Sequence, residues 1–100
     1  VRNVTNMREM FYNCKNFDQD IGNWNVRNVT KTNGMFYDCR NFNQNIRNWD
    51  VNNVTDMECM FYECHIFNQY IINWNLDDIL YTDDMLCGCD NFDKFNETRI

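Results

Sequence analysis

Apolar side chains recur along the chain in columns that lie 25 residues apart. The first copy carries nine of them, and most are apolar again in each later copy: Val1, Val4, Met7, Met10, Phe11, Cys14, Phe17, Ile21 and Trp24. Nine apolar positions are too few to close a core within one copy, whereas stacked copies share a continuous core. The sequence therefore predicts a single domain over residues 1–100, as a fragment of a longer array, with four copies: 1–25, 26–50, 51–75 and 76–100.

The first half of each copy has the spacing of a helix. Val4, Met7 and Met10 follow one another at intervals of three residues, which is a helical stripe. Thr5 stands where an N-cap residue belongs. We therefore expect a short helix at about residues 5–13 and at the equivalent positions of the later copies.

The second half of each copy alternates in the manner of a strand, as in residues 17–21. A strand and a short helix in each 25-residue unit predict an α/β repeat. In this fold class, four strand-plus-short-helix units form a leucine-rich-repeat-like solenoid with a parallel sheet on one face. The alternative is a β-solenoid in which the helix is only a turn.

Two stretches of sequence, NVTDMECMFYECHIFNQYIINWN and NVTKTNGMFYDCRNFNQNIRNWD, resemble the BspA-like leucine-rich-repeat family. More narrowly, they resemble its 25-residue variant, found in mycoplasma-type surface lipoproteins and in large DNA viruses. The resemblance covers the whole chain and implies a non-catalytic solenoid, often on a cell surface and often involved in adhesion. Two departures stand out: relatives usually have Ser where this chain has Asn, Arg or Asp, and the fourth copy places Asn96 and Arg99 in the columns of Ile21 and Trp24.

Charge narrows the range of partners. The chain has 9 Lys and Arg against 15 Asp and Glu, a net charge of −6. A nucleic-acid binder needs a basic patch, and an anionic membrane surface attracts basic segments, so we expect neither partner. No apolar run approaches the roughly 20 residues of a membrane span, so we expect no direct membrane insertion by this segment. The remaining partners are a protein or glycan ligand, or neighbouring repeats of the same protein.

Four cysteine and three tryptophan positions form structural ladders along the copies: Cys14, Cys39, Cys64 and Cys89, with Trp24, Trp49 and Trp74. We interpret the ladder thiols as small buried hydrophobes that point inward. Cys59 and Cys87 lie outside the ladder, where a bridge between neighbouring copies is an alternative to free thiols. Zinc needs four convergent ligands, and this arrangement does not supply them, so we expect no metal and no cofactor.

The sequence gives little support to catalysis. It contains no Ser and no Gly-rich phosphate loop. The adjacent Cys64 and His65 are expected on different faces, so they do not form a nucleophile–base pair. We therefore predict that the chain is not an enzyme.

Two columns of the expected sheet face change character from copy to copy, whereas the inward columns stay uniform. We predict a binding surface there, formed by five residues: Asn45, Arg47, Tyr70, Ile72 and Phe95. Aromatic and Arg side chains are frequent anchors of interfaces. The function favoured by the sequence is binding of protein or carbohydrate by an adhesion module at a cell surface or outside the cell. The alternative is a scaffold element of a larger assembly, in a virus particle or inside a cell.

Overall fold

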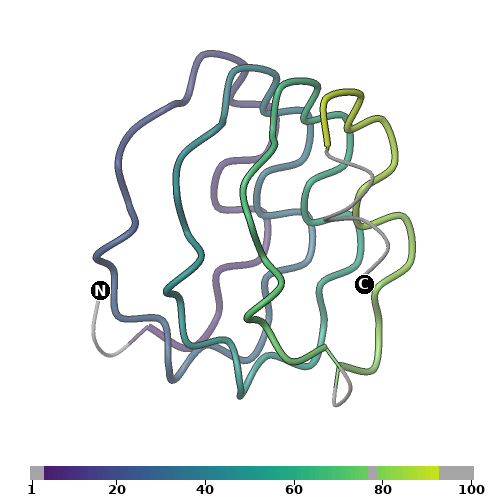
Figure 1. Cartoon of the computed structure of the whole chain (residues 1–100). Helices are drawn as coiled ribbons and strands as arrows, with labels where there is room; N and C mark the ends of the chain where they lie inside the picture. The colour runs from purple at the N-terminus through teal and green to yellow at the C-terminus, as the bar shows by residue number, and fades with distance from the viewer. Residues whose placement is uncertain (1–3, 77–78, 93–100) are drawn as a thin grey trace.

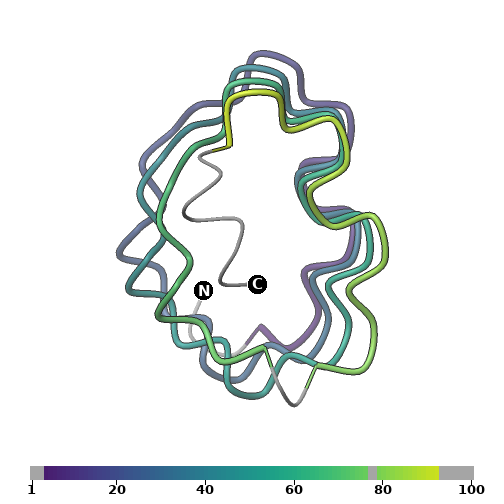
Figure 2. The same ribbon diagram turned by 45° about the vertical axis from the view of Figure 1, so that its right-hand side comes forward.

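The computed structural model describes residues 4–76 and 79–92. Within these residues there is no helix and no strand, and β pairing is limited to isolated parallel bridges that join Asn6, Lys31, Asp56 and Tyr81 in succession. The chain winds in coils that lie side by side (Figure 1). The coils follow nearly the same outline in the second view (Figure 2), with each coil built from one 25-residue copy.

The expected helix over residues 5–13 is absent, and consecutive turns take its place. The N–H of Met10 donates to the carbonyl of Met7 at 3.2 Å, which closes a four-residue β-turn. The N–H of Glu9 instead donates to the carbonyl of Asn33 in the next coil, at 3.0 Å. An α-helix needs each N–H to bond four residues back along its own chain. Here alternate N–H groups leave the coil, so the helix cannot form.

Left-handed backbone conformations fix these turns. Glu9 has a φ of 56° and Asn13 a φ of 61°. The same two columns are left-handed in the later copies: Gly34, Asp38, Cys59, Glu63, Asp84 and Gly88. A left-handed residue ends a right-handed helix, so the three-residue spacing of inward side chains arises from successive turns.

The parallel sheet expected from residues 17–21 is also absent, because side chains connect the coils in that segment. The N–H of Asn43 donates to Oδ1 of Asp18 at 3.0 Å, and Nε2 of Gln44 donates to the carbonyl of Asp18 at 3.1 Å. One coil further on, Asn68 and Gln69 bond to Asn43 in the same way. A sheet needs main chain bonded to main chain. The prediction of a leucine-rich-repeat-like solenoid of strand-plus-helix units is therefore wrong in both elements.

Stacked aromatic rings fill the interior of the coils. The ring of Phe36 lies between those of Phe11 and Phe61, with centroid distances of 5.7 and 5.5 Å. A second stack, with centroids 5.8 to 6.0 Å apart, runs through Phe17, Phe42, Phe67 and Phe92. Fully burying one such side chain contributes about 1.5–3 kcal/mol. Because rings of one coil stack on rings of the next, this burial depends on the stacking of copies.

The two buried tryptophans differ in hydrogen bonding. Nε1 of Trp49 donates to the carbonyl of Ile21 in the preceding coil, at 3.0 Å. Nε1 of Trp74 is buried and has no acceptor among the described residues. The two indoles stack at 6.4 Å and are similarly buried, so they form a matched pair.

Replacing Trp49 by Phe should lower the free energy of unfolding more than replacing Trp74 by Phe, by about 1 kcal/mol. Trp49→Phe removes a donor and leaves a buried carbonyl with one bond fewer. Trp74→Phe removes a donor that is unsatisfied. Urea denaturation followed by circular dichroism measures both variants, and equal losses of stability would contradict the assignment.

Candidate functional site

The structure describes four of the five residues predicted to form the binding surface. Asn45 and Arg47 are exposed on the second coil. Tyr70 and Ile72 lie on the third coil, with 55% and 37% of their surface exposed. Phe95 lies outside the described residues. The surface therefore joins a polar pair on one coil to an apolar pair on the next.

Asn45 also shapes the backbone. Its Oδ1 accepts the N–H of Arg47 at 3.0 Å, and Asp20 accepts the N–H of Gly22 in the same way one coil earlier. These are Asx turns, in which a side-chain oxygen bonds the backbone two residues on. Tyr70 occupies the same column and has no such oxygen. The exchange of Asn for Tyr thus gives up a turn bond and places an aromatic ring on the surface.

A polar hollow of about 230 Å³ adjoins this surface. Its lining residues come from the second and third copies: Arg47, Asn48, Trp49, Asp50, Val51, Asn52, Asn73 and Trp74. Arg47 belongs to both the hollow and the predicted surface. A ligand that contacts Tyr70 and Ile72 can therefore also reach the guanidinium group and neighbouring amides.

A second hollow, of about 290 Å³, lies beside a ladder of tyrosines. Tyr12 stacks on Tyr37 with ring centroids 4.5 Å apart, and Tyr37 stacks on Tyr62 at 4.7 Å. The hollow is lined by the first three copies: Glu9, Tyr12, Asn33, Gly34, Tyr37, Glu58 and Cys59. The sequence analysis missed this hollow. The feature that could have indicated it is Gly34, which has no side chain in a column that otherwise holds Glu9, Cys59 and Asp84.

The ladder cysteines make hydrogen bonds that the sequence analysis did not foresee. Sγ of Cys39 donates to the carbonyl of Phe11 at 3.0 Å, and Sγ of Cys64 to that of Phe36 at 2.9 Å. Cys89 repeats the bond one coil later. The thiols of Cys39 and Cys64 are fully buried, as expected for side chains that point inward. Cys89 is half-buried, and Cys14, in the first coil, is exposed to solvent. Trp24 is likewise half-buried. The thiols are thus donors as well as core atoms.

Burial changes the acidity of these thiols. It raises the pKa of Cys39 and of Cys89 to about 12, and it raises the pKa of Cys64 still further. Such thiols are protonated at neutral pH, and a thiol is a weak nucleophile compared with its thiolate. All six cysteines are free, including Cys59 and Cys87, for which a bridge was the alternative.

His65 lies on the surface between two acidic side chains. Its Nδ1 is 3.0 Å from Oδ2 of Asp90, and its Nε2 is 3.9 Å from Oε1 of Glu63. In the described part of the chain no group of three or more His, Cys, Asp or Glu side chains is arranged to hold a metal ion. The same residues include no helix with the length and hydropathy of a membrane span.

Leu80 and Tyr81 form a further apolar surface that the sequence analysis missed. They are 73% and 52% exposed, at columns where the second coil has Thr30 and Lys31. Thr30 donates its hydroxyl to the carbonyl of Thr5, and Leu80 cannot repeat this bond. The sequence pattern that could have revealed this surface is the one that selected Tyr70: a column with polar residues in the other copies holds an apolar residue in one copy.

A family model described as "Mycoplasma protein of unknown function, DUF285" matches residues 1–98. The comparisons find no match among curated proteins and none among solved structures. The resemblance to mycoplasma-type proteins is confirmed at this level. The narrower assignment to the BspA-like leucine-rich-repeat group is not supported, and the fold differs from the one that it implied.

Replacing Cys39 by Ala should reduce the loss of stability at alkaline pH. The pKa of this thiol rises from an ordinary value of 9.0 to about 12 on folding. Its protonated form therefore stabilises the fold fully below pH 9.0, and that contribution is lost as the pH rises toward about 12. Urea denaturation between pH 8 and pH 11 would measure the slope of stability against pH.

The control for this experiment is Val54→Ala, which removes a buried apolar side chain that carries no titrating proton. It should keep the wild-type slope, whereas Cys39→Ala should have a shallower one. Identical slopes for all three proteins would show that the buried thiol does not contribute to the alkaline loss.

Proposed function

Since this chain belongs to the Mycoplasma protein family of unknown function DUF285, we propose a function from its surface. The chain is a non-catalytic module that binds a protein or a glycan at a cell surface. Contact is made through Arg47, Tyr70 and Ile72, on neighbouring coils. The observation that carries the proposal is the 55% exposure of Tyr70 in a column that holds Asp20 and Asn45 in the other described copies.

An exposed aromatic ring leaves apolar area in water. Where Tyr replaces a turn-forming Asn, the turn hydrogen bond is lost and no apolar surface is buried in return. The ring becomes favourable when a partner covers it. Aromatic and Arg side chains are enriched among the residues that dominate binding energy at interfaces. Ile72 and Arg47 share one column on adjacent coils and add an apolar and a cationic group to the contact.

The frame behind these residues supports a binding role. Trp49 and Trp74 stack on each other and line the same hollow as Arg47, and Trp49 is bonded to the preceding coil. Side chains on such a frame lose little freedom when a ligand binds, which favours affinity. The buried ladder thiols are protonated at neutral pH, which agrees with a module that performs no chemistry.

The scaffold role is the alternative function. It would also use the outer faces of the coils, with neighbouring repeats or other copies as partners. A scaffold needs no cell-surface ligand, so a measurement of binding to cells separates the two roles.

Tyr70→Asp and Ile72→Asp should each reduce binding of the labelled protein to cultured epithelial cells by about tenfold or more. Each change places a charge where a partner would cover apolar surface. Flow cytometry measures retention, and circular dichroism checks folding. Treating the cells first with protease or with glycosidase tells whether the ligand is a protein or a glycan.

Tyr81→Asp is the matched control, because Tyr81 is exposed to a similar extent at a different column. It should retain wild-type binding. Loss of binding in Tyr81→Asp with full binding in Tyr70→Asp would place the contact elsewhere. Absence of binding in the unmodified protein would favour the scaffold role.

A further inference from the structure

Each junction between neighbouring coils is held by the same set of backbone hydrogen bonds. Four N–H groups of one coil donate to four carbonyls of the next coil, at distances of 2.7 to 3.0 Å. Between the third and fourth coils, the donors are Met57, Cys59, Phe61 and Glu63, and the acceptors are Tyr81, Asp83, Met85 and Cys87. A coil inside the stack therefore uses its donor row on one neighbour and its acceptor row on the other.

At the two end coils, one of these rows is unpaired. In the fourth coil, four N–H groups have no acceptor among the described residues: Thr82, Asp84, Leu86 and Gly88. In the first coil, four carbonyls have no donor within the same part of the chain: Asn6, Arg8, Met10 and Tyr12. The two rows lie at opposite ends of the stack (Figure 1), so they do not pair within one molecule. Rows of unpaired backbone groups are templates for pairing with another chain.

The open side of the first coil also exposes a column that is buried elsewhere. Met10 is 40% exposed, whereas Met35 and Met60 are 0% exposed and Met85 is 4% exposed. Met85 is buried although it belongs to the fourth coil, so side chains of this column are covered by the coil before them. Cys14 is exposed in the same way. The first coil thus presents an apolar face of the kind that a preceding coil covers at the internal junctions.

The fourth coil carries an acceptor for the thiol of Cys14. At the last internal junction, the carbonyl of Phe61 accepts both the N–H of Cys64, at 3.0 Å, and the thiol of Cys89, at 2.9 Å. Leu86 occupies the column of Phe61, and its carbonyl accepts the N–H of Cys89 at 3.1 Å. A carbonyl oxygen has two lone pairs, so Leu86 can accept a thiol as well.

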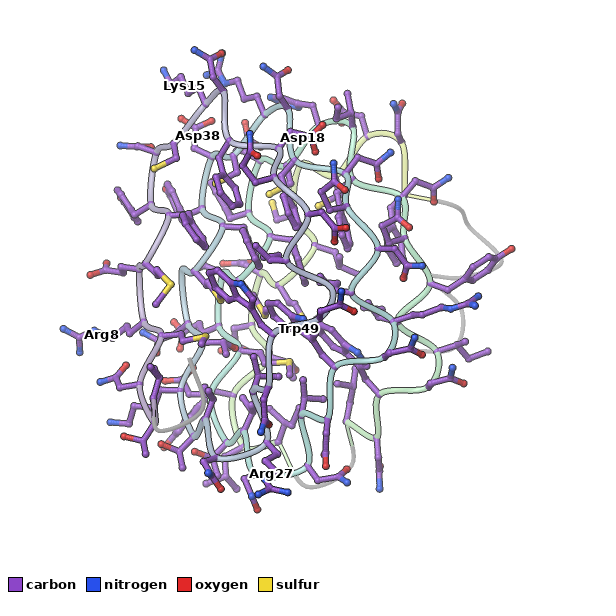
Figure 3. All side chains as sticks on the ribbon, turned by 90° about the vertical axis from the view of Figure 1, so that its left-hand side faces the viewer. Arg8, Lys15, Asp18, Arg27, Asp38 and Trp49 are labelled. Carbon is purple, nitrogen blue, oxygen red and sulfur yellow. The ribbon has the colours of Figure 1, made fainter. Side chains whose placement is uncertain are left out.

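Charges on the two end coils are opposite in two columns. Residues 79–92 of the fourth coil carry Asp83, Asp84 and Asp90 and contain no Lys or Arg. Arg8 of the first coil shares the column of Asp83, and Lys15 shares the column of Asp90. Figure 3 shows Arg8 and Lys15 at the outer edge of the coils. Opposite charges in matching positions favour the encounter of the two faces.

Side chains of one column approach each other across a junction. Nδ1 of His65 lies 3.0 Å from Oδ2 of Asp90, which is 25 residues further on. A Cβ added to Gly34 would lie 3.3 Å from Cγ of Glu9 in the same column. Asp84 also belongs to that column, so packing a first coil on a fourth coil brings the carboxylates of Glu9 and Asp84 together. This one repulsion can be removed by substitution.

We propose that copies of this chain associate head to tail, with the first coil of one molecule packed on the fourth coil of another. The contact repeats an internal junction: four N–H groups meet four carbonyls, a thiol meets a carbonyl, and Met10 is covered. A second copy is the occupant because it offers the complete row of partners at the spacing of the coils. This inference goes beyond the proposed function and does not depend on it.

The assembly is open-ended, because a contact between two different surfaces leaves one surface of each kind free. The coils follow nearly the same outline when viewed from the side (Figure 2), so added copies continue the same stack. The expected product is a filament whose length rises with protein concentration.

Sedimentation velocity of the whole chain, with a reducing agent present, tests the proposal over about a hundredfold range of concentration. We expect the average sedimentation coefficient to rise throughout this range. Met10→Lys places a charge on the face to be covered and should abolish the rise. Ile72→Lys is the matched control, because Ile72 is 37% exposed on an inner coil of the stack, and it should associate as the unmodified protein does. Circular dichroism checks the folding of both variants.

Charge variants provide the second arm. Arg8→Glu and Asp83→Arg should each weaken association by about threefold or more, and an equal mixture of the two variants should restore it. Arg27→Glu makes the same change of charge on the second coil and should have no effect. Glu9→Gln removes the repulsion from Asp84 and should strengthen association by about twofold.

Four results would overturn the proposal. A sedimentation coefficient that stays at the value of a monomer would show that the end coils do not pair. A limiting dimer would show that the contact joins two like surfaces. Equal behaviour of Met10→Lys and Ile72→Lys would place the contact elsewhere. Equal weakening by Arg8→Glu and Arg27→Glu would show that association follows the net charge and not the columns.

Discussion

The structure depends on hydrogen bonds that leave each coil for its neighbour. In the turn segment, the N–H of Phe36 donates to the carbonyl of Met60 at 2.9 Å, and alternate N–H groups before and after it do the same. Buried backbone groups must find partners, and a lone coil would leave half of these unpaired. A coil of this kind is therefore stable only against another coil with the same turns in the same places. The repeated sequence is a condition for satisfying the backbone.

Side chains supply the bonds that the main chain does not. Cys39 and Trp49 both donate backward to carbonyls 28 residues earlier, and Gln44 donates to a carbonyl 26 residues earlier. These bonds favour Cys, Trp and Gln over Val, Phe and Leu at residues 39, 49 and 44. A thiol fills the volume of a small apolar group and also gives a second donor to a carbonyl that already accepts a backbone N–H. At these positions the side chain thus serves the coil before it as a hydrogen-bond donor.

The 25-residue spacing of the sequence recurs in the bridges that join Asn6, Lys31, Asp56 and Tyr81, but the local structure predicted for each copy was wrong. The spacing of Trp24, Trp49 and Trp74 gives the repeat length directly, because a large side chain in a shared core must recur once per coil. The helix was wrong because Glu9 and Asn13 are left-handed, and a non-glycine residue gives no clear sequence signal of that conformation. The strand was wrong because Asp18 and its equivalents act through side chains, which a pattern of apolar and polar positions does not show.

The candidate sites were predictable to a similar degree. Tyr70 could be selected because its column changes from polar to aromatic, and the structure places it on the surface. The cavity at Gly34 could not be inferred without knowing that this column faces outward next to stacked tyrosines. Its formation depends on three neighbouring coils at once, whereas an inspection of columns considers one position at a time.

The bonds between coils also determine which changes of length the gene can tolerate. The bonds between coils join fixed columns of adjacent copies, such as Thr30 to Thr5 and Thr55 to Thr30, which lie 25 residues apart. Unequal recombination between copies can add or remove 25 codons, which adds or removes one complete coil. Every hydrogen-bond donor then still lies opposite an acceptor. A change that is not a multiple of 25 residues shifts all downstream columns out of phase. Tandem DNA of this kind can therefore lengthen and shorten between generations while each product still folds, and the surface exposed by the protein changes with the number of layers.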